Sequence, residues 1–337
     1  MVDGFIAGLP KAELHVHLEG TLEPEMLFML AARNEIELPW SDLDELRAAY
    51  RFTGLEHFLP LLFKGASALR RSQDFYDLTH AYLTRAAADG VRRTEMSLGV
   101  QSFLDSGIPI GDQIDSALAA IADARRDLRI DGALMVTSQR HRSQAAALEV
   151  LDLIAPWSDQ IIGIGLGAAE RGNPPGKFAE YYETARARGY RTTIHAGEDG
   201  PADYVREALD VCRPNRIDHG VAAATDPALM TRLRDEGIPL TVCPLSNVAL
   251  QVVPSMAEHP LRMLHEAGVV VTVNSDDPPY FGGYINDNYE AIHEHLGLDQ
   301  ATLAELARAS FRASFDDPAR IAEHLAAIDE YVAQSEK

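Results

Sequence analysis

The segment Thr192-Thr193-Ile194-His195-Ala196-Gly197-Glu198 has the pattern of a short β-branched strand that ends at a histidine. Two small residues and a carboxylate follow the histidine, and Asp199-Gly200-Pro201 can then turn the chain. On a loop at a strand end, His195 and Glu198 can face one small pocket, where one holds a metal ion and the other a proton. A buried structural histidine would leave the same pattern, so the interpretation depends on how the other strands end.

Seven more short apolar runs, separated by helical patterns, give eight expected strands in all. They are Ala12–Leu18, Val91–Leu98, Ile130–Thr137, Ile161–Leu166, Arg191–His195, Arg216–His219, Leu240–Cys243 and Val269–Asn274. Helix signals lie between them: Asp226 and Pro227 are typical of a helix start, and Gly237 of a helix end. Eight strand-helix units predict an α/β fold, a (β/α)8 TIM barrel in one domain over residues 1–337. A doubly wound sheet is the alternative, but no Gly-x-Gly-x-x-Gly motif follows the first run.

About seventy residues separate the first run from the second, which is far more than one crossover helix needs. Several amphipathic patterns fill this interval. We therefore expect a helical insertion, at about residues 24–90, that caps the C-terminal face of the barrel. The insertion either only packs there or also supplies the apolar walls of a pocket, through Leu55, Phe58, Leu61, Leu62 and Phe63.

The composition limits the classes of partner. The 337 residues carry a net charge of −21, which disfavours nucleic acid and anionic membranes because their phosphates would be repelled. The two cysteines, Cys212 and Cys243, form no disulfide framework, and no apolar run approaches the ~20 residues of a membrane helix. Residues 1–20 have no signal-peptide pattern. We expect a cytoplasmic protein that acts on a small neutral or cationic molecule.

Histidines and aspartates stand at the expected strand ends, where a barrel of this kind places its chemistry. His15 and His17 share one face of the first run because side chains alternate along a strand. His195 ends the fifth run, and Asp276 and Asp277 follow the eighth. Three imidazoles and one of these two carboxylates suit Zn²⁺ with a place left for water, and also suit Fe²⁺ or Co²⁺. The structural alternative for the aspartates is a helix N-cap.

A metal ion in this set would lower the pKa of bound water from about 16 toward about 7. The residues left over are the second aspartate, His219 and Glu198, and these can orient hydroxide, accept its proton and deliver a proton to a substrate. The fourth run, Gly163-Ile164-Gly165-Leu166-Gly167, lacks a lysine that could bridge two metals, so one ion is expected. Cys243 has no partner for the Pro-Cys-x-x-Cys design of other zinc deaminases.

Five motifs in order resemble the adenosine/adenine deaminase family of metal-dependent (β/α)8 hydrolases. They are Leu14-His15-Val16-His17-Leu18-Glu19-Gly20, His195-Ala196-Gly197-Glu198, Asp218-His219-Gly220, Cys243-Pro244-Leu245-Ser246-Asn247 and Ser275-Asp276-Asp277-Pro278. The resemblance covers the chain from Leu9 to about Phe315. It implies a small purine substrate and one metal ion bound by His15, His17, His195 and Asp276.

The resemblance also implies roles in hydrolytic deamination. Glu198 would donate a proton to purine N1 while hydroxide attacks C6, and His219 would orient and deprotonate the water. Asp277 would hold the water and form a hydrogen bond to N7. A backbone group of Gly165 or Gly167 would contact N3.

Within the family, the sequences of Glu19–Glu25 and Tyr280–Tyr284 resemble those of adenine deaminases. Nucleoside deaminases usually carry aspartate at the position of Glu19. A longer glutamate would close the space for a ribose; the alternative is a salt-bridged residue at the mouth. Two segments depart from the adenine deaminase pattern, at Glu95–Val100 and Gly165–Glu170. Both are expected to be strand ends that have lost polar partners. Adenine is the expected substrate, and the alternatives are adenosine, an N6-substituted adenine or purine binding without catalysis.

Overall fold

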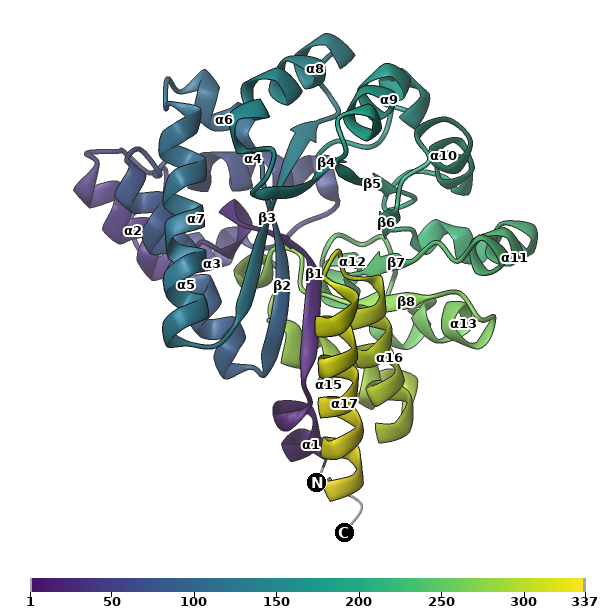
Figure 1. Ribbon diagram of the computed structural model, residues 1–337. Helices are drawn as coiled ribbons and strands as arrows, with labels where there is room; N and C mark the ends of the chain where they lie inside the picture. The colour runs from purple at the N-terminus through teal and green to yellow at the C-terminus, as the bar shows by residue number, and fades with distance from the viewer. Residues whose placement is uncertain (1, 336–337) are drawn as a thin grey trace.

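Eight parallel strands form the centre of the computed structural model, which describes residues 2–335 (Figure 1). Each strand pairs with its neighbour in sequence, in the order β1 to β8. The strands are β1 (Lys11–His17), β2 (Val91–Leu98), β3 (Asp131–Gln139), β4 (Ile161–Gly167), β5 (Arg191–Ala196), β6 (Arg216–His219), β7 (Leu240–Val242) and β8 (Val271–Val273). Nearly all their residues are buried, as parallel strands covered by helices require. The predicted barrel is confirmed, with strand ends that differ from the predicted ones by at most two residues.

The barrel closes where the segment after β8 meets β1. The backbone N–H of Asp276 donates to the carbonyl oxygen of His15 at 3.2 Å, and the N–H of His17 donates to the carbonyl oxygen of Asp276 at 3.0 Å. These two hydrogen bonds place three of the predicted metal ligands side by side, at the C-terminal ends of the strands.

Helices surround the sheet (Figure 1). They are α1 (Val2–Gly8), α2 (Pro24–Arg33), α3 (Leu43–Ala49), α4 (Leu55–Ala66), α5 (Ser72–Ala88), α6 (Val100–Asp105), α7 (Ile110–Asp127), α8 (Gln144–Leu153), α9 (Ala179–Ala187), α10 (Ala202–Glu207), α11 (Pro227–Glu236), α12 (Pro244–Ala249), α13 (Leu261–Glu266), α14 (Pro278–Phe281), α15 (Ile285–Leu296), α16 (Gln300–Ala313) and α17 (Pro318–Ser335). Over residues 2–335, none of these helices is long and apolar enough to span a bilayer.

The predicted insertion at residues 24–90 divides into two parts. Helix α5 packs beside α7 in the outer ring and leads directly into β2 (Figure 1). Helix α4 belongs instead to a separate apolar cluster, in which Phe58 contacts the rings of Phe52, Tyr280 and Phe281. Because Tyr280 and Phe281 follow β8, this cluster fixes α4 over the end of the barrel that carries the predicted site.

Candidate active site

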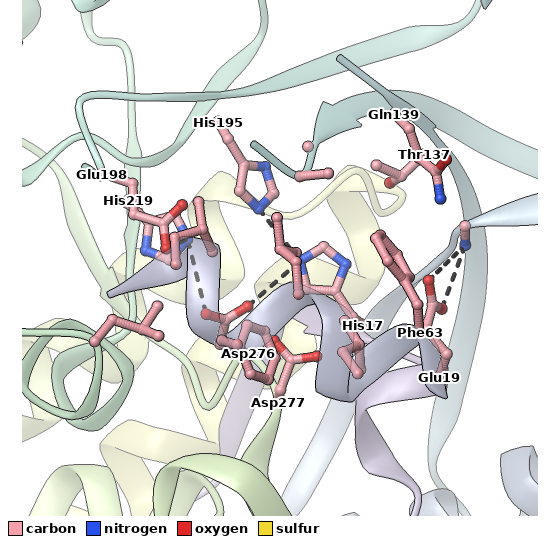
Figure 2. Close-up of a pocket in the computed structure, with 18 of the residues that line it drawn as sticks. His17, Glu19, Phe63, Thr137, Gln139, His195, Glu198, His219, Asp276 and Asp277 are labelled. Carbon is pink, nitrogen blue, oxygen red and sulfur yellow. Dashed lines mark hydrogen bonds and ion pairs between the residues drawn. The ribbon is translucent and has the colours of Figure 1, made fainter. Parts of the chain in front are cut away.

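The four predicted metal ligands converge at the ends of β1, β5 and β8. Figure 2 shows three of them, His17, His195 and Asp276. The Nε2 atom of His17 lies 3.2 Å from Nε2 of His195 and 3.3 Å from Oδ1 of Asp276. The Nε2 atom of His15 lies 3.4 Å from the same carboxylate oxygen. A tetrahedral zinc ion with bonds of 2.0–2.1 Å requires ligand atoms about 3.3–3.4 Å apart. The observed spacings therefore fit one zinc-sized ion.

The protonation of His17 and Asp276, and the free Nε2 atom of His15, also fit a metal. The Nδ1–H of His15 can donate to the carbonyl oxygen of Thr241 at 3.2 Å, which leaves Nε2 as a lone-pair donor without a hydrogen-bond partner. Burial lowers the pKa of His17 to about 3, so its ring is neutral. Burial would raise the pKa of Asp276, but His15 and the neighbouring imidazoles hold it well below its usual range. Neutral imidazoles and an ionised carboxylate are the forms that ligate metals.

Asp218 and Ser246 support these ligands, and the sequence analysis assigned neither of them a role. Oδ2 of Asp218 lies 3.3 Å from Nδ1 of His195, and its Oδ1 accepts a hydrogen bond from the Thr241 hydroxyl at 2.9 Å. Ser246 Oγ donates to Oδ2 of Asp276 at 2.7 Å, so that Oδ1 faces the histidines. Such outer partners orient metal ligands and set their tautomers. Both residues lie in motifs that the sequence shares with the family, and this was the only sign in the sequence that they belong to the site.

His219 is a fourth imidazole at the cluster, and its geometry differs from that of His17. Its Nε2 atom lies 3.8 Å from Oδ2 of Asp276, the oxygen that already accepts from Ser246. His17 instead approaches the free Oδ1 and His195. Ligand atoms of His15, His195, His219 and Asp276 also lie within 4.8 Å of one another, so His219 is near enough to compete. The shorter distances from His17 to Asp276 and His195 favour His17 as the ligand.

Glu198 and His219 face each other across this space (Figure 2). Glu198 Oε1 lies 3.6 Å from Nε2 of His219, and both side chains are buried. Burial, followed by the charges of Asp276 and Glu170, raises the pKa of Glu198 well above its usual value. Burial lowers the pKa of His219 well below its usual value. A protonated Glu198 beside a neutral His219 is suited to deliver a proton to a bound substrate.

The backbone leaves β6 and β8 in an unusual conformation at two site residues. His219 has φ 61° and Asp276 has φ 65°, which is the left-handed region that L side chains rarely adopt. Such strain gathers at functional sites, where the surrounding structure enforces it.

Asp277 is buried against the backbone of Gly20. A Cβ atom at position 20 would lie 1.7 Å from Oδ1 of Asp277, so only glycine fits there. Oδ1 itself has no hydrogen-bond partner. Burial, followed by the adjacent charge of Asp276, raises the pKa of Asp277 well above its usual value. A protonated Asp277 can donate a hydrogen bond to a substrate nitrogen.

Glu170 holds the loop that carries Glu198. Its buried carboxylate accepts hydrogen bonds from the backbone N–H groups of Gly197, Glu198, Asp199 and Gly200, at 2.6–3.1 Å. Four donors on one carboxylate fix the loop after β5, as an anion fixes the N–H groups of a nest. This role was missed because it joins two strand ends through backbone groups, which no sequence pattern displays.

A pocket lies beside the predicted ligands His17, His195 and Asp276, and Glu198 and His219 also line it. Helix α4 provides an apolar wall through Leu55, Phe58, Leu59, Leu62 and Phe63. Leu61, predicted for this wall, packs against the Phe58 cluster instead, and Leu59, which was not predicted, lines the pocket. Thr137 and Gln139 at the end of β3 also line it, although the sequence analysis assigned nothing to that strand end (Figure 2).

Glu19 closes one side of the pocket. Its carboxylate accepts the backbone N–H of Gly99 at 3.1 and 3.3 Å, which joins the ends of β1 and β2 (Figure 2). A Cβ atom at Gly99 would lie 2.3 Å from Oε1 of Glu19. Burial raises the pKa of Glu19 to about 7. Glu19 is buried and forms no ion pair among the described residues, which disfavours the alternative of a salt-bridged residue at the mouth.

Two residues that were expected at strand ends lie inside their strands instead. Glu95 does not stand at a strand end: it lies inside β2, where its carboxylate contacts Arg93 at 3.0 Å and Arg216 at 2.6 Å. Gly165 also lies inside β4, and its carbonyl oxygen accepts from the hydroxyl of Tyr181. Gly167, in contrast, lines the pocket. A backbone contact to a substrate therefore remains an expectation for Gly167 alone.

Comparison with known proteins gives consistent results. The family model described as adenosine deaminase matches residues 10–331. An adenine deaminase of Rhodopseudomonas palustris (strain BisB18) is 48% identical over 333 residues, 99% of this chain and 97% of that protein. The crystal structure of an adenine deaminase from Arthrobacter aurescens has a TM-score of 0.95 and 46% identity, and the match covers 96% of this chain and 99% of that one. A zinc-bound amidohydrolase from Burkholderia ambifaria has a TM-score of 0.90 and 29% identity, covering 99% and 93%.

Proposed function

The chain belongs to the adenosine deaminase family, in its adenine deaminase branch, and we propose that it hydrolyses adenine to hypoxanthine and ammonia with one bound metal ion. The observation that carries this proposal is the convergence of His15, His17, His195 and Asp276 beneath an apolar pocket that also contains Glu198.

The proposed metal is Zn²⁺, and Fe²⁺ is the alternative for the same ligands. When bound, the ion lowers the pKa of water toward about 7 and so supplies hydroxide at neutral pH. A proton on Nδ1 of His15, facing the carbonyl oxygen of Thr241, would leave its Nε2 atom for this ion, and Asp218 contacts Nδ1 of His195. Ser246 leaves one oxygen of Asp276 free to bind.

Glu198 is the proposed proton donor to N1 of the purine. The raised pKa of its carboxyl group keeps the proton on Glu198 until substrate binds. Glu170 holds the loop that carries Glu198 in position by accepting its backbone N–H. A proton on N1 withdraws electrons from C6, where the oxygen adds. The added hydroxyl group then gives its proton to the amino group, the C6–nitrogen bond breaks, and ammonia leaves the 6-oxopurine. His219 orients the attacking oxygen, and protonated Asp277 donates a hydrogen bond to N7.

The walls of the pocket favour a free base over a nucleoside. Glu19 fills the side of the pocket between β1 and β2, where its carboxylate accepts a hydrogen bond from the backbone N–H of Gly99. Helix α4 covers the opening with Phe58 and Phe63 rather than with polar groups that could bind ribose hydroxyls. A planar aromatic base suits such a surface.

An N6-substituted adenine is the second candidate. Gly167 and Ala168 line the pocket at the end of β4 without bulky or polar side chains. The test compares the steady-state hydrolysis of adenine, adenosine and N6-methyladenine by zinc-loaded protein. Formation of the 6-oxopurine product is measured for each substrate. The proposal predicts the highest kcat/KM for adenine. A higher kcat/KM for adenosine or N6-methyladenine would replace it with the corresponding alternative.

A further inference from the structure

A chain of buried hydrogen bonds leads from the backbone near α13 to the ring of His219. The N–H of Leu261 donates to Nδ1 of His259 at 3.1 Å. Nε2 of His259 lies 3.1 Å from Oδ1 of Asn247, and Nδ2 of Asn247 lies 3.2 Å from Nδ1 of His219. The three side chains are at most 3% exposed, so water does not compete for these bonds.

The first bond fixes the direction of the others. A backbone N–H can only donate, so Nδ1 of His259 is an acceptor and carries no proton. Burial lowers the pKa of His259 to about 4, so at neutral pH its single ring proton is on Nε2. That proton needs an acceptor, which is Oδ1 of Asn247. The amide nitrogen of Asn247 is then directed at His219 and donates to its Nδ1.

We propose that His259 and Asn247 are positioning residues that fix the tautomer of His219, with Nδ1 as acceptor and the ring proton on Nε2. The Nε2–H group points into the reaction space, 3.6 Å from Oε1 of Glu198 and 3.8 Å from Oδ2 of Asp276. Resting on the proposed function, this assigns His219 as a hydrogen-bond donor to the attacking oxygen. It removes the role of proton acceptor that the family resemblance implies for neutral His219.

The chemical identity of Asn247 supports this assignment. In a Ser-His-Asp triad, a carboxylate accepts the Nδ1–H of histidine and leaves Nε2 as a base. Here an amide donates to Nδ1, which produces the opposite tautomer. An Nε2–H donor binds hydroxide more strongly than water, because hydroxide is the better acceptor, and it stabilises negative charge that develops on the attacking oxygen.

The direct test is the ring ¹⁵N spectrum of His219 in the zinc-loaded full chain with ¹⁵N-labelled histidine. Long-range ¹H–¹⁵N correlation separates a protonated ring nitrogen from an unprotonated one, and the His219→Gln variant identifies the signals of His219 by their loss. We expect a protonated Nε2 and an unprotonated Nδ1 for both His219 and His259. A protonated Nδ1 on His219, in a neutral or a charged ring, would overturn the proposal.

This spectrum is recorded without substrate. It therefore reports the tautomer even if adenine is not the substrate, and failure of the proposed function would appear only in turnover.

Two substitutions at His259 test whether the chain acts on catalysis. His259→Gln keeps an amide N–H near the position of Nε2, whereas His259→Leu removes the donor. We expect His259→Leu to lower kcat by about 10- to 100-fold with little change in KM, and to give His219 a protonated Nδ1. His259→Gln should restore most of kcat and the original ring signals. Equal kcat and unchanged ring signals in both variants would contradict the proposal, and the wild-type spectrum decides if His259→Leu does not fold.

Asn247→Asp is the opposite perturbation. A carboxylate oxygen against Nδ1 should draw the proton of His219 onto Nδ1, and the wrong tautomer of a catalytic histidine lowers kcat by about 10⁴-fold in serine proteases. We expect a large loss of kcat with zinc content retained. Wild-type kcat in Asn247→Asp, with Nε2 still protonated, would show that Asn247 does not set the tautomer.

Discussion

The Nε2 atoms of His17 and His195 lie 3.2 Å apart, although 178 positions separate the two residues in the sequence. Two imidazole nitrogens at this distance either share a proton or bind a common ion. Oδ1 of Asp276 lies 3.3 Å from Nε2 of His17, and the unpartnered Nε2 of His15 lies 3.4 Å from the same oxygen. These three spacings match the distance of about 3.3–3.4 Å between ligand atoms around a tetrahedral zinc ion, which favours a common ion over a shared proton.

Replacement of Glu198 tests its role as proton donor. Glu198→Gln keeps the shape of the side chain but removes the acidic proton, so kcat for adenine should fall by about 10²- to 10⁴-fold. Zinc content should not change, because Glu198 is not a ligand. Glu180→Gln, on the exposed face of α9, is the matched control and should retain kcat. Wild-type kcat in Glu198→Gln would show that another group protonates the purine.

Shortening Glu19 tests the choice between base and nucleoside. Glu19→Asp withdraws the carboxylate from the N–H of Gly99 and opens space beside the base. The ratio of kcat/KM for adenine to that for adenosine should fall by about tenfold or more, as for other one-methylene changes in a pocket. Glu19→Gln keeps the length and should keep most of the ratio. An unchanged ratio in Glu19→Asp would mean that Glu19 does not exclude the ribose.

The loop that carries Glu198 should depend on Glu170. Glu170→Ala leaves four backbone N–H groups without their acceptor, and the free energy of unfolding should fall by about 3 kcal/mol. Glu170→Gln keeps one acceptor oxygen and should lose less. Urea unfolding measures both variants. The kcat of Glu170→Gln should also fall, because Glu198 shifts with the loop; equal stability of wild type and Glu170→Ala would contradict this account.

Burial of His259 predicts a loss of stability in acid. Its pKa is about 4 in the folded state and about 6.5 in the unfolded state, so between these values the unfolded chain binds more protons. The contribution of His259 to the free energy of unfolding is therefore fully present above about pH 6.5. It falls by about 3 kcal/mol as the pH is lowered to about 4. Urea unfolding of wild type and His259→Gln from pH 7 to 4.5 should show a shallower decline in the variant. Parallel declines would contradict a neutral buried His259.

The sequence specified the strand ends well, because parallel barrels place polar chemistry where buried apolar runs stop. Alternation along β1 correctly put His15 and His17 on one face. Local capping signals were equally informative: Asp226 caps α11 by accepting from two backbone N–H groups, and Gly237 ends the helix with φ 65°. These features depend on neighbours within a few residues, which a sequence displays directly.

Contacts between distant strands were not predictable. Glu95 resembled a strand-end residue because Arg216, its partner inside the barrel, lies 121 positions away. Asp218 stood beside His219 in a recognised motif, but only the fold shows that its carboxylate faces His195. Likewise, no pattern connects His259 with the catalytic pocket, because the connection passes through the side chain of Asn247.

The central claim is that one metal ion at His15, His17, His195 and Asp276 supports adenine hydrolysis. The most direct test is a titration of metal-free protein with Zn²⁺, in which ammonia release from adenine is followed against the number of ions added per chain. The account predicts no turnover without metal and a linear rise that ends at one equivalent. Full turnover by metal-free protein, or a rise that continues to two equivalents, would contradict it.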